Sequence, residues 1–470
     1  MQLLDIIVIL IYFGTMIVIG LYGSMKAKTT EEYVLAGRNL GFFMFFGCMA
    51  AVILGGASTI GTAKLGYQYG ISGMWFVVMI GLGMLLLGIF MIRPLYGEKV
   101  KTISELLGKR YNTETRYLSA VVASIYTLMV SVTQVIGMGT VFHAVLGWDD
   151  HVSMLVGGGI VLFYTLLGGM WSVTITDIVQ FVIKATGIFV IMLPMSLYAA
   201  GGWSNLVSRL PDSHFDLTHI GLTQILQYFL LYTLGLIISQ DIWQRTFTAK
   251  TERISRTGSI AAGVFSIAYA IAISIIGMCG VVVIPNIDNP QNIFAAMALK
   301  ILPPGVLGLV LACVCSALMS TSSGTLLASS TLITNDILKP FFFQNADEKR
   351  LMTVSRVVTL LVGLTGIVFA IWIQDVLVAL DVAYAILSGA IFVPVVLGFF
   401  WKRATAKAGF YSIIISTLVI IAGLAIEGIT STNPIMYGIA VSFLVMIILS
   451  LIPASKEVVV SNETAKQEHS

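Results

Sequence analysis

Hydrophobic residues along the chain gather into thirteen long runs, which are separated by short polar segments. A helix needs about 20 apolar residues to cross the hydrocarbon core of a bilayer, so most of these runs have the length of a membrane span. The pattern predicts an all-α integral membrane protein with about 13 transmembrane helices. The runs are approximately Asp5–Gly23, Phe42–Leu65, Met74–Ile92, Leu118–Leu146, Val152–Leu167, Ile175–Tyr198, Leu222–Ile238, Ala261–Ile284, Val306–Leu332, Val354–Trp372, Val376–Phe400, Ala408–Ile426 and Pro434–Leu451.

Composition supports this prediction. Of 470 residues, 57% are hydrophobic and 10% are charged, whereas soluble proteins carry about 25% charged residues. Most of the surface must therefore face lipid, and no room remains for a large soluble domain. The basic residues form no continuous patch, so nucleic acid is not an expected partner. The four cysteines lie inside apolar runs, which argues against a disulfide framework.

Basic residues divide unevenly between the two sides that successive runs define. One set of segments holds 23 of the 26 lysines and arginines, and the opposite set holds Arg209 and Lys300. Because cytoplasmic loops are enriched in lysine and arginine, we expect the N-terminus outside and the C-terminus in the cytoplasm of a multi-pass cell-membrane protein. Residues 1–454 are expected to form a single transmembrane domain, and residues 455–470 a polar cytoplasmic tail.

The second run contains a glycine pair, Gly55 and Gly56, which Ser58 and Thr59 follow. Glycine lowers helix stability by about 1 kcal/mol relative to alanine, and a broken helix frees backbone carbonyls that can bind a cation. Close packing of helices through small residues is the alternative explanation. These residues alone leave both explanations open.

The ninth run carries a cluster of hydroxyl side chains. Ala317, Ser320, Thr321 and Gly324 share one helical face by their i, i+3 and i+4 spacing. A hard cation such as Na⁺ prefers oxygen ligands, and a broken neighbouring helix could add carbonyls to the hydroxyls. Serine and threonine can instead bond to the carbonyl four residues earlier, so the cluster by itself also leaves two explanations open.

Several charged residues lie within or beside the apolar runs, where an ionisable group is costly and tends to be functional. They are Lys64, Asp177, Lys184, Asp241 and Asp381. Asp177 and Lys184 are expected at the cytoplasmic end of the sixth run, where the lysine can extend to water. Asp241 can pair with Arg245, four residues on. Lys64 and Asp381 have no such explanation and are candidates for function.

Six motifs occur in order along the chain. They are Glu31–Arg38, Gly168–Ser172 with Thr176–Gln180, Gln244–Thr246, Ala317–Thr321, Thr334–Ile337 and Gly398–Arg403. In this combination, from about Asp5 to Leu451, the chain resembles the sodium:solute symporters, which include sodium/glucose, proline, pantothenate, sialic acid and choline transporters. The resemblance implies a LeuT-type core of two inverted five-helix repeats, 42–198 and 222–400, with one helix before it at 5–23 and two after it at 408–451.

The same resemblance implies a Na⁺ site between the broken helix and the ninth run, with Na⁺ as the coupling ion. The ligands carried over to this chain are Ala51, Leu54, Ala317, Ser320 and Thr321. Asp177 matches an acidic residue near the cytoplasmic exit of that site. Ser323 matches part of a second Na⁺ site found in some relatives, and Gly324 at the next position departs from it.

Departures from the sugar and choline branches narrow the solute. Asp381 and Ser58 stand where sugar carriers place glutamines, and Ile53 and Ser239 stand where choline carriers place tryptophans. Lys64 and Asp381 together suit a zwitterion, with its carboxylate on Lys64 and its ammonium on Asp381. We therefore expect symport of an amino acid or similar zwitterion by alternating access. The candidate solute-binding residues are Ser58, Lys64, Ser239, Gln240, Asp241 and Asp381.

Other functions stay open. The solute could be a monocarboxylate bound by Lys64, or a polyamine-like organic cation bound by Asp381 and Asp241. Lys64 and Asp381 could also pair with each other and only set a gate, and Lys64 as a substitute cation would favour H⁺ coupling. A non-transporting sensor would need a soluble signalling domain, and an enzyme would need convergent ligands at membrane depth. The sequence shows neither feature, and it implies no obligatory protein partner.

Overall fold

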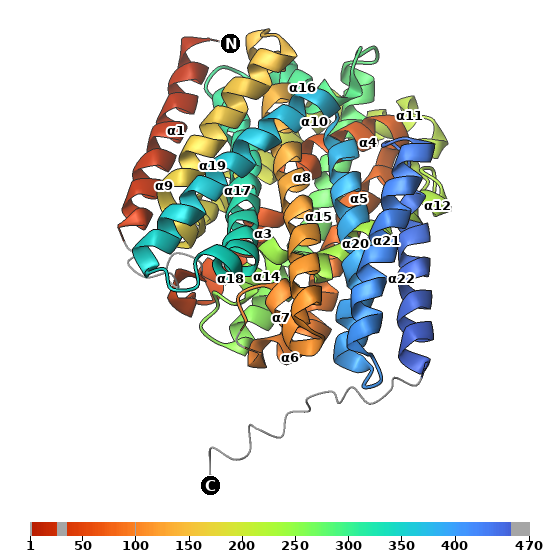
Figure 1. The fold of residues 1–470 in the computed structure, drawn as a ribbon. Coiled ribbons are helices and arrows are strands. Elements are labelled where there is room, and N and C mark those ends of the chain that lie inside the picture. Colours follow the sequence, from red (N-terminus) through yellow and green to blue (C-terminus); the bar gives the residue numbers. More distant parts are fainter. Residues whose placement is uncertain (1, 26–34, 99, 453–470) are drawn as a thin grey trace.

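A computed structural model describes residues 2–25, 35–98 and 100–452. The part of the first motif at residues 31–34, Lys99 and the tail at 455–470 lie outside the described residues. Within the described ranges the protein is a bundle of helices, and its extended pairing is limited to one isolated bridge between Leu40 and Ala249. The start of α1 and the end of α22 lie at opposite ends of the bundle (Figure 1).

The long helices follow the predicted apolar runs, and shorter helices lie between them. They are α1 (Leu3–Ser24), α3 (Phe42–Ile53), α4 (Thr62–Tyr69), α5 (Trp75–Leu86), α6 (Ile92–Gly97), α7 (Ile103–Arg110), α8 (Thr113–Leu146), α9 (Asp150–Ala185), α10 (Leu193–Ala199), α11 (Gly202–Arg209), α12 (Leu222–Tyr228), α13 (Leu234–Ile237), α14 (Gln240–Thr246), α15 (Glu252–Val283), α16 (Ile293–Ile301), α17 (Val306–Leu332), α18 (Lys339–Phe342), α19 (Glu348–Ile373), α20 (Val376–Phe400), α21 (Ala406–Glu427) and α22 (Pro434–Leu451). Short π-helical turns continue several of them, including η2 (Ala57–Gly61) before α4 and η5 (Thr186–Met192) after α9.

Ten helical stretches of the described residues are long and apolar enough to cross a membrane, or eleven if the bent pair Leu222–Ile237 and Gln240–Thr246 is one span. The number is below thirteen for local reasons. The end of the second run joins the third run in one helical stretch, Ala57–Gly97. The beginning of the second run, α3, and the stretch Asp150–Phe163 are each too short to count as a span. The count of thirteen and the orientation of the termini therefore stay predictions.

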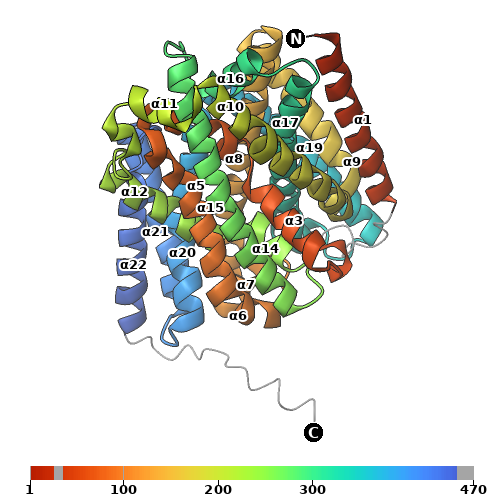
Figure 2. The ribbon, with the colours of Figure 1, turned by 180° about the vertical axis from the view of Figure 1, so that it is seen from behind.

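The centre of the bundle is α17. Every residue from Val310 to Leu332 is buried, and α17 packs against α8, α9 and α3. By contrast, α1 and α22 lie at the edges of the bundle (Figures 1 and 2) and expose many of their side chains. The hydroxyl cluster of the ninth run therefore lies in the protein interior, against the broken helix.

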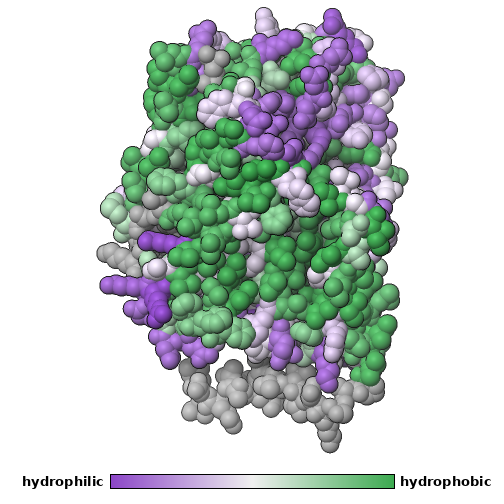
Figure 3. Space-filling model, turned by 45° about the horizontal axis from the view of Figure 1, so that its top comes forward, coloured by the Kyte–Doolittle hydropathy of each residue, from purple (hydrophilic) through white to green (hydrophobic). Residues whose placement is uncertain are grey.

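On the face that Figure 3 shows, hydrophobic side chains form a broad band across the middle, and hydrophilic side chains gather toward the two ends. Large apolar residues such as Phe43 and Ile426 are each 84% exposed. A soluble protein would leave such an area in water at a high cost, whereas a bilayer covers it. The surface and the helix lengths agree on a multi-pass membrane protein.

Candidate functional site

The second apolar run is a broken helix, which is one of the two explanations that the glycine pair left open and the one that the family resemblance implied. Helix α3 ends at Ile53, Leu54 has non-helical dihedral angles, and the helix resumes at Ala57 in η2. Carbonyls at the end of a helix lack the usual amide partners. At this break, side chains supply the missing donors.

Four consecutive carbonyls at the break accept such hydrogen bonds. Val52 O accepts from Thr321 Oγ1 at 2.7 Å, and Ile53 O accepts from Ser58 Oγ at 2.8 Å. Ala51 O accepts from Ser320 Oγ at 2.9 Å. Ala51 O and Leu54 O also accept from the Lys184 ammonium, at 2.5 and 3.3 Å. The break therefore presents carbonyl oxygens of Ala51, Val52 and Leu54 to side chains of α17 and α9.

Both glycines of the pair are needed for close packing. A Cβ atom at Gly55 would lie 2.6 Å from Thr321 Oγ1, and one at Gly56 would lie 2.0 Å from Leu318 Cδ2. The Gly56 amide donates to Gln134 Oε1 at 2.8 Å, which fixes the break to α8. Sequence reasoning missed Gln134, because an amide in an apolar run also satisfies itself within its own helix; its Nε2 donates to Val130 O.

The predicted Na⁺ ligands converge, and a protein ammonium lies at their centre. Lys184 Nζ donates to Ala51 O, to Leu54 O and, at 3.1 Å, to Ser320 Oγ. Ala317 O accepts from Ser320 Oγ at 3.2 Å. Three of the five predicted ligands thus surround Lys184.

Lys184 is only 1% exposed, so the expectation that it extends to cytoplasmic water is wrong. Its position follows from the packing of α9 on α17. A Cβ atom at Gly187 would lie 2.8 Å from Cys313 Cβ, and Cys313 Sγ lies 3.8 Å from Lys184 O. The sequence did carry a signal: Asp177, Gln180 and Lys184 recur at helical spacing on one face, and all three are buried.

Asp177, the acidic residue expected near the exit of the Na⁺ site, belongs to a buried ion pair. Asp177 Oδ2 accepts from Arg245 Nη2 at 3.1 Å and from Cys48 Sγ at 3.2 Å. A Cβ atom at Gly324 would lie 2.4 Å from the Arg245 guanidinium nitrogens, so the guanidinium fills the space beside this glycine. Ser323 Oγ donates to Ser320 O within its own helix. Arg245 contacts the backbone carbonyl of Asp241 through Nη1 at 3.3 Å.

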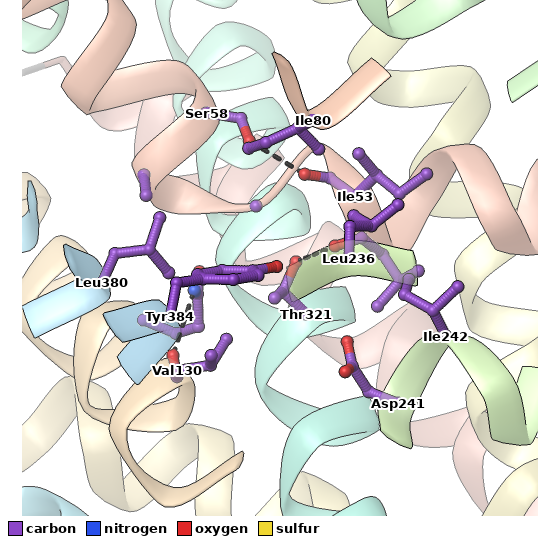
Figure 4. Close-up of a pocket in the computed structure, with 14 residues that line it drawn as sticks. Ile53, Ser58, Ile80, Val130, Leu236, Asp241, Ile242, Thr321, Leu380 and Tyr384 are labelled. Atoms are coloured by element: carbon purple, nitrogen blue, oxygen red, sulfur yellow. Dashed lines mark hydrogen bonds between the residues drawn. The ribbon is translucent and has the colours of Figure 1, made fainter. Parts of the chain in front are cut away.

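A small cavity of about 30 Å³ lies between the break, α8, α14 and α20. Of the predicted solute-binding residues, Ser58 and Asp241 line it, on opposite sides (Figure 4). Gln240 instead holds α7, because its Oε1 accepts from Ile103 N at 2.8 Å, and Ser239 Oγ donates to Leu236 O. Ser58 and Asp241 therefore line the cavity, whereas Ser239 and Gln240 do not.

Tyrosine rings form one wall of this region. Tyr126 OH donates to Asp241 Oδ1 at 3.2 Å, and the Tyr126 ring packs on Tyr384 with centroids 5.1 Å apart. Tyr384 packs in turn on Tyr232 at 5.1 Å, and Tyr232 OH donates to Asp381 Oδ1. Asp381 is therefore linked to the cavity through aromatic rings and is not among the residues that line it.

Comparison with known proteins identifies the family of this chain. The model of the sodium:solute symporter family matches residues 33–416. The chain belongs to this family.

Relatives of this symporter-family chain include bacterial proline carriers. The high-affinity proline transporter PutP of Bacillus subtilis (strain 168) is 28% identical over 425 residues, which cover 86% of this chain and 89% of that protein. The sodium/proline symporter of Staphylococcus aureus (strain NCTC 8325 / PS 47) is 26% identical over 478 residues, with 95% and 91% coverage. The family and these relatives are transporters.

Two solved structures share the fold of this family member. A substrate-bound, outward-open Na⁺-coupled sialic acid symporter matches with a TM-score of 0.85 at 19% identity, over 96% of this chain and 98% of that one. MHP1, a nucleobase-cation-symport-1 family transporter in a closed conformation, matches with a TM-score of 0.57 at 15% identity, over 88% and 93%. The likeness agrees with the expected LeuT-type fold.

Lys64 has a different partner from the one expected in this symporter. Its Nζ forms an ion pair with Asp375 Oδ2 at 2.8 Å, and the two side chains are 19% and 34% exposed. Burial raises the pKa of the Asp375 carboxyl, but Lys64 and the amides of Leu377 and Val378 outweigh burial and leave that pKa below its ordinary value. Sequence reasoning missed Asp375, although its place directly before α20 is typical of a helix cap.

Proposed function

We propose that this protein imports a small amino acid or similar zwitterion across the cell membrane, by symport with a monovalent cation and alternating access. The observation that carries the proposal is the cavity at the helix break. The Asp241 carboxylate lies on one side, and the start of the segment Ala57–Tyr69 lies on the other. Family membership supplies the transport class.

The two sides of the cavity offer complementary charges. Asp241 is 5% exposed and can accept a hydrogen bond from a substrate ammonium. The resumed helix begins at Ala57, and the positive end of a helix dipole favours a carboxylate. Broken helices of transporters bind anionic substrate groups in this way. Asp241 and the helix end therefore replace Asp381 and Lys64 as the proposed recognition groups.

The cavity is too small for an amino acid in this conformation. Its volume of about 30 Å³ leaves room for only two or three water molecules, at about 10–15 Å³ for each. The side chains of Ile80, Leu380 and Tyr384 close around it. Substrate entry thus requires these residues to move, and we propose that the Lys64–Asp375 pair contributes to an outer gate.

A cation gradient provides the driving force in this proposal. The family description and the names of the Staphylococcus relatives refer to sodium, which supports coupling to a cation. Coupling to H⁺ is the alternative. The two ions are distinguished by imposing each gradient separately.

An organic cation is the second candidate solute. Asp241 has the rings of Tyr126 and Tyr384 beside it, and aromatic faces stabilise ammonium groups. A substrate without a carboxylate would use these residues and leave the helix end uncontacted. Competition between an amino acid and its amide or decarboxylated analogue separates the two candidates.

Uptake into proteoliposomes tests the proposal. Proline, other small amino acids, monocarboxylates and polyamines are offered under an inward Na⁺ gradient, under an inward H⁺ gradient and under neither. We expect accumulation of a zwitterion under a cation gradient, and loss of binding in Asp241→Asn. Accumulation of polyamines alone would favour the second candidate. Failure of every solute under both gradients would exclude cation-coupled symport of these solute classes.

A further inference from the structure

The oxygens that the family uses for Na⁺ contact a cation belonging to the chain itself. A lysine ammonium has three N–H donors, and Lys184 directs them to Ala51 O, Leu54 O and Ser320 Oγ at 2.5, 3.3 and 3.1 Å. Each predicted ligand in this shell is a neutral oxygen, as around a bound alkali ion. Lys184 thus gives these three oxygens a cationic hydrogen-bond donor where a bound Na⁺ would otherwise contact them.

The remaining predicted ligands are used elsewhere. Thr321 Oγ1 donates to Val52 O at 2.7 Å, and Ala317 O accepts from Ser320 Oγ at 3.2 Å. A Na⁺ ion in this shell would have to displace the ammonium or lie beside it. Two positive charges so close repel each other strongly in a medium of low polarity. The residues present therefore do not fit Na⁺ while Lys184 is in place.

The charges around Lys184 do not compensate an additional cation. Asp177 lies on the same helix, but its carboxylate accepts from Arg245 of α14 at 3.1 Å. Cys48 of α3, which donates to Asp177, and Cys313 of α17, which contacts the Lys184 carbonyl, are the other titratable neighbours. Among the described residues, no carboxylate lies within ion-pair distance of Lys184.

A second cationic side chain lies beside Gly324, the position that departs from the second Na⁺ site of some relatives. The Arg245 guanidinium occupies the space beside Gly324, where a Cβ atom would lie only 2.4 Å from its nitrogens. Arg245 is 1% exposed and pairs with Asp177, the acidic residue that the family places near the ion path. The predicted Na⁺ site and the space beside Gly324 therefore both contain a cationic side chain.

We propose that Lys184 supplies, as part of the chain, the positive charge that Na⁺ brings to this site in Na⁺-coupled relatives, so that Lys184 excludes Na⁺ and determines ion specificity. Its consequence for transport rests on the proposed symport. The exclusion of Na⁺ is a binding property and can be measured without any solute. Uptake is then independent of Na⁺ at this site.

Thermal unfolding of the purified full chain in detergent tests the proposal, with tryptophan fluorescence as the readout. NaCl replaces choline chloride at constant ionic strength. We expect no Na⁺-specific change in the melting temperature of the wild type. Lys184→Ala and the longer neutral variant Lys184→Met should gain a saturable Na⁺-specific increase of about 2 °C or more. Lys184→Arg, which keeps the charge, should not.

The double variant Lys184→Ala with Ser320→Ala is the matched control, because it removes a ligand of the restored site. It should lose the gained Na⁺ response. A saturable Na⁺-specific stabilisation of the wild type that Ser320→Ala abolishes would overturn the proposal. Absence of a Na⁺ response in both Lys184→Ala and Lys184→Met would overturn it as well, since Lys184 would then not be what excludes the ion. Neither outcome depends on whether the solute has been identified.

Discussion

Two lysines in the first half of the chain, Lys64 and Lys184, lie in similar apolar sequence and in opposite surroundings. Lys64 is 19% exposed at its side chain and forms an ion pair with Asp375, which is 34% exposed. Lys184 is 1% exposed and binds two backbone carbonyls and a hydroxyl. Lys64, the outer lysine, is part of a partly exposed ion pair. Lys184, the inner lysine, takes the place of an ion.

The difference in burial between Lys64 and Lys184 indicates which polar interactions matter most for the stability of this protein. The cost of removing a charge from water grows with burial, so each buried group depends on its partners. Half-exposed groups can exchange their partners for water at little cost. Changes in the inner cluster around Lys184 and Arg245 should therefore have larger effects than changes at the outer pair.

The largest expected effect is at the inner ion pair. Asp177→Ala leaves the Arg245 guanidinium buried without its carboxylate, and we expect the free energy of unfolding to fall by about 3–5 kcal/mol. Denaturant titration in detergent micelles measures the change. Lys64→Met is the control at the outer pair, because it leaves the Asp375 cap of α20 in place, and it should cost about 1 kcal/mol or less. Equal losses for the two variants would remove the distinction between inner and outer charges.

A packing change at the helix break comes next. Gly56→Ala places a Cβ atom 2.0 Å from Leu318 Cδ2, and we expect this overpacking to cost about 1–3 kcal/mol. Gly159→Ala is the matched control, since a Cβ atom there meets nothing within 4 Å. Melting temperatures of the two variants in the same detergent make the comparison. If Gly159→Ala destabilises as much as Gly56→Ala, close approach at the break is not what requires glycine.

Neither lysine lines the cavity at the helix break, and Asp241 is the charged residue that does. Asp241→Asn should weaken solute affinity about ten-fold or more, equivalent to about 1.4 kcal/mol, because it removes the carboxylate that faces the cavity. Asp381→Asn should have a smaller effect, since Asp381 bonds to Tyr232. Binding isotherms for the solute identified by uptake give both values. A larger loss in Asp381→Asn would restore Asp381 as the recognition group.

The smallest effect is expected at the outer pair. A double-mutant cycle with Lys64→Met and Asp375→Asn should give a coupling energy of about 0.2–1 kcal/mol that decreases with salt. Unfolding at low and high ionic strength supplies the values. A coupling several times larger, or one that salt does not change, would show that the pair is desolvated in the working conformation.

Much of the candidate site follows from local sequence pattern. The glycine pair indicated either a broken helix or close packing, and the family resemblance favoured the break. The hydroxyls of Ser320 and Thr321 lie against its carbonyls at 2.9 and 2.7 Å. Small residues and hydroxyls at helical spacing carry this information, because the break and the hydroxyl face are properties of single helices. The same logic located Asp241 among the intramembrane charges.

Pairings between distant residues did not follow from pattern. Lys64 was expected to face Asp381, but it pairs with Asp375, and Asp381 bonds to Tyr232. Positions six residues apart on one helix differ by more than a turn in height and by a large rotation. Hydropathy reports neither quantity, so the partner of Lys64 could not be derived.

The sequence by itself determined that this protein is a bundle of membrane-spanning helices, with a helix weakened at Gly55 and Gly56 and a hydroxyl face at Ser320 and Thr321. Apolar run length and local propensity suffice for these features. Only the tertiary structure decided what lies between them. Lys184 is 133 residues from Ala51 and 136 from Ser320, and its ammonium reaches both because α9 packs closely on α17 and α3. The occupant of the ion site depends on that packing, which no single helix encodes.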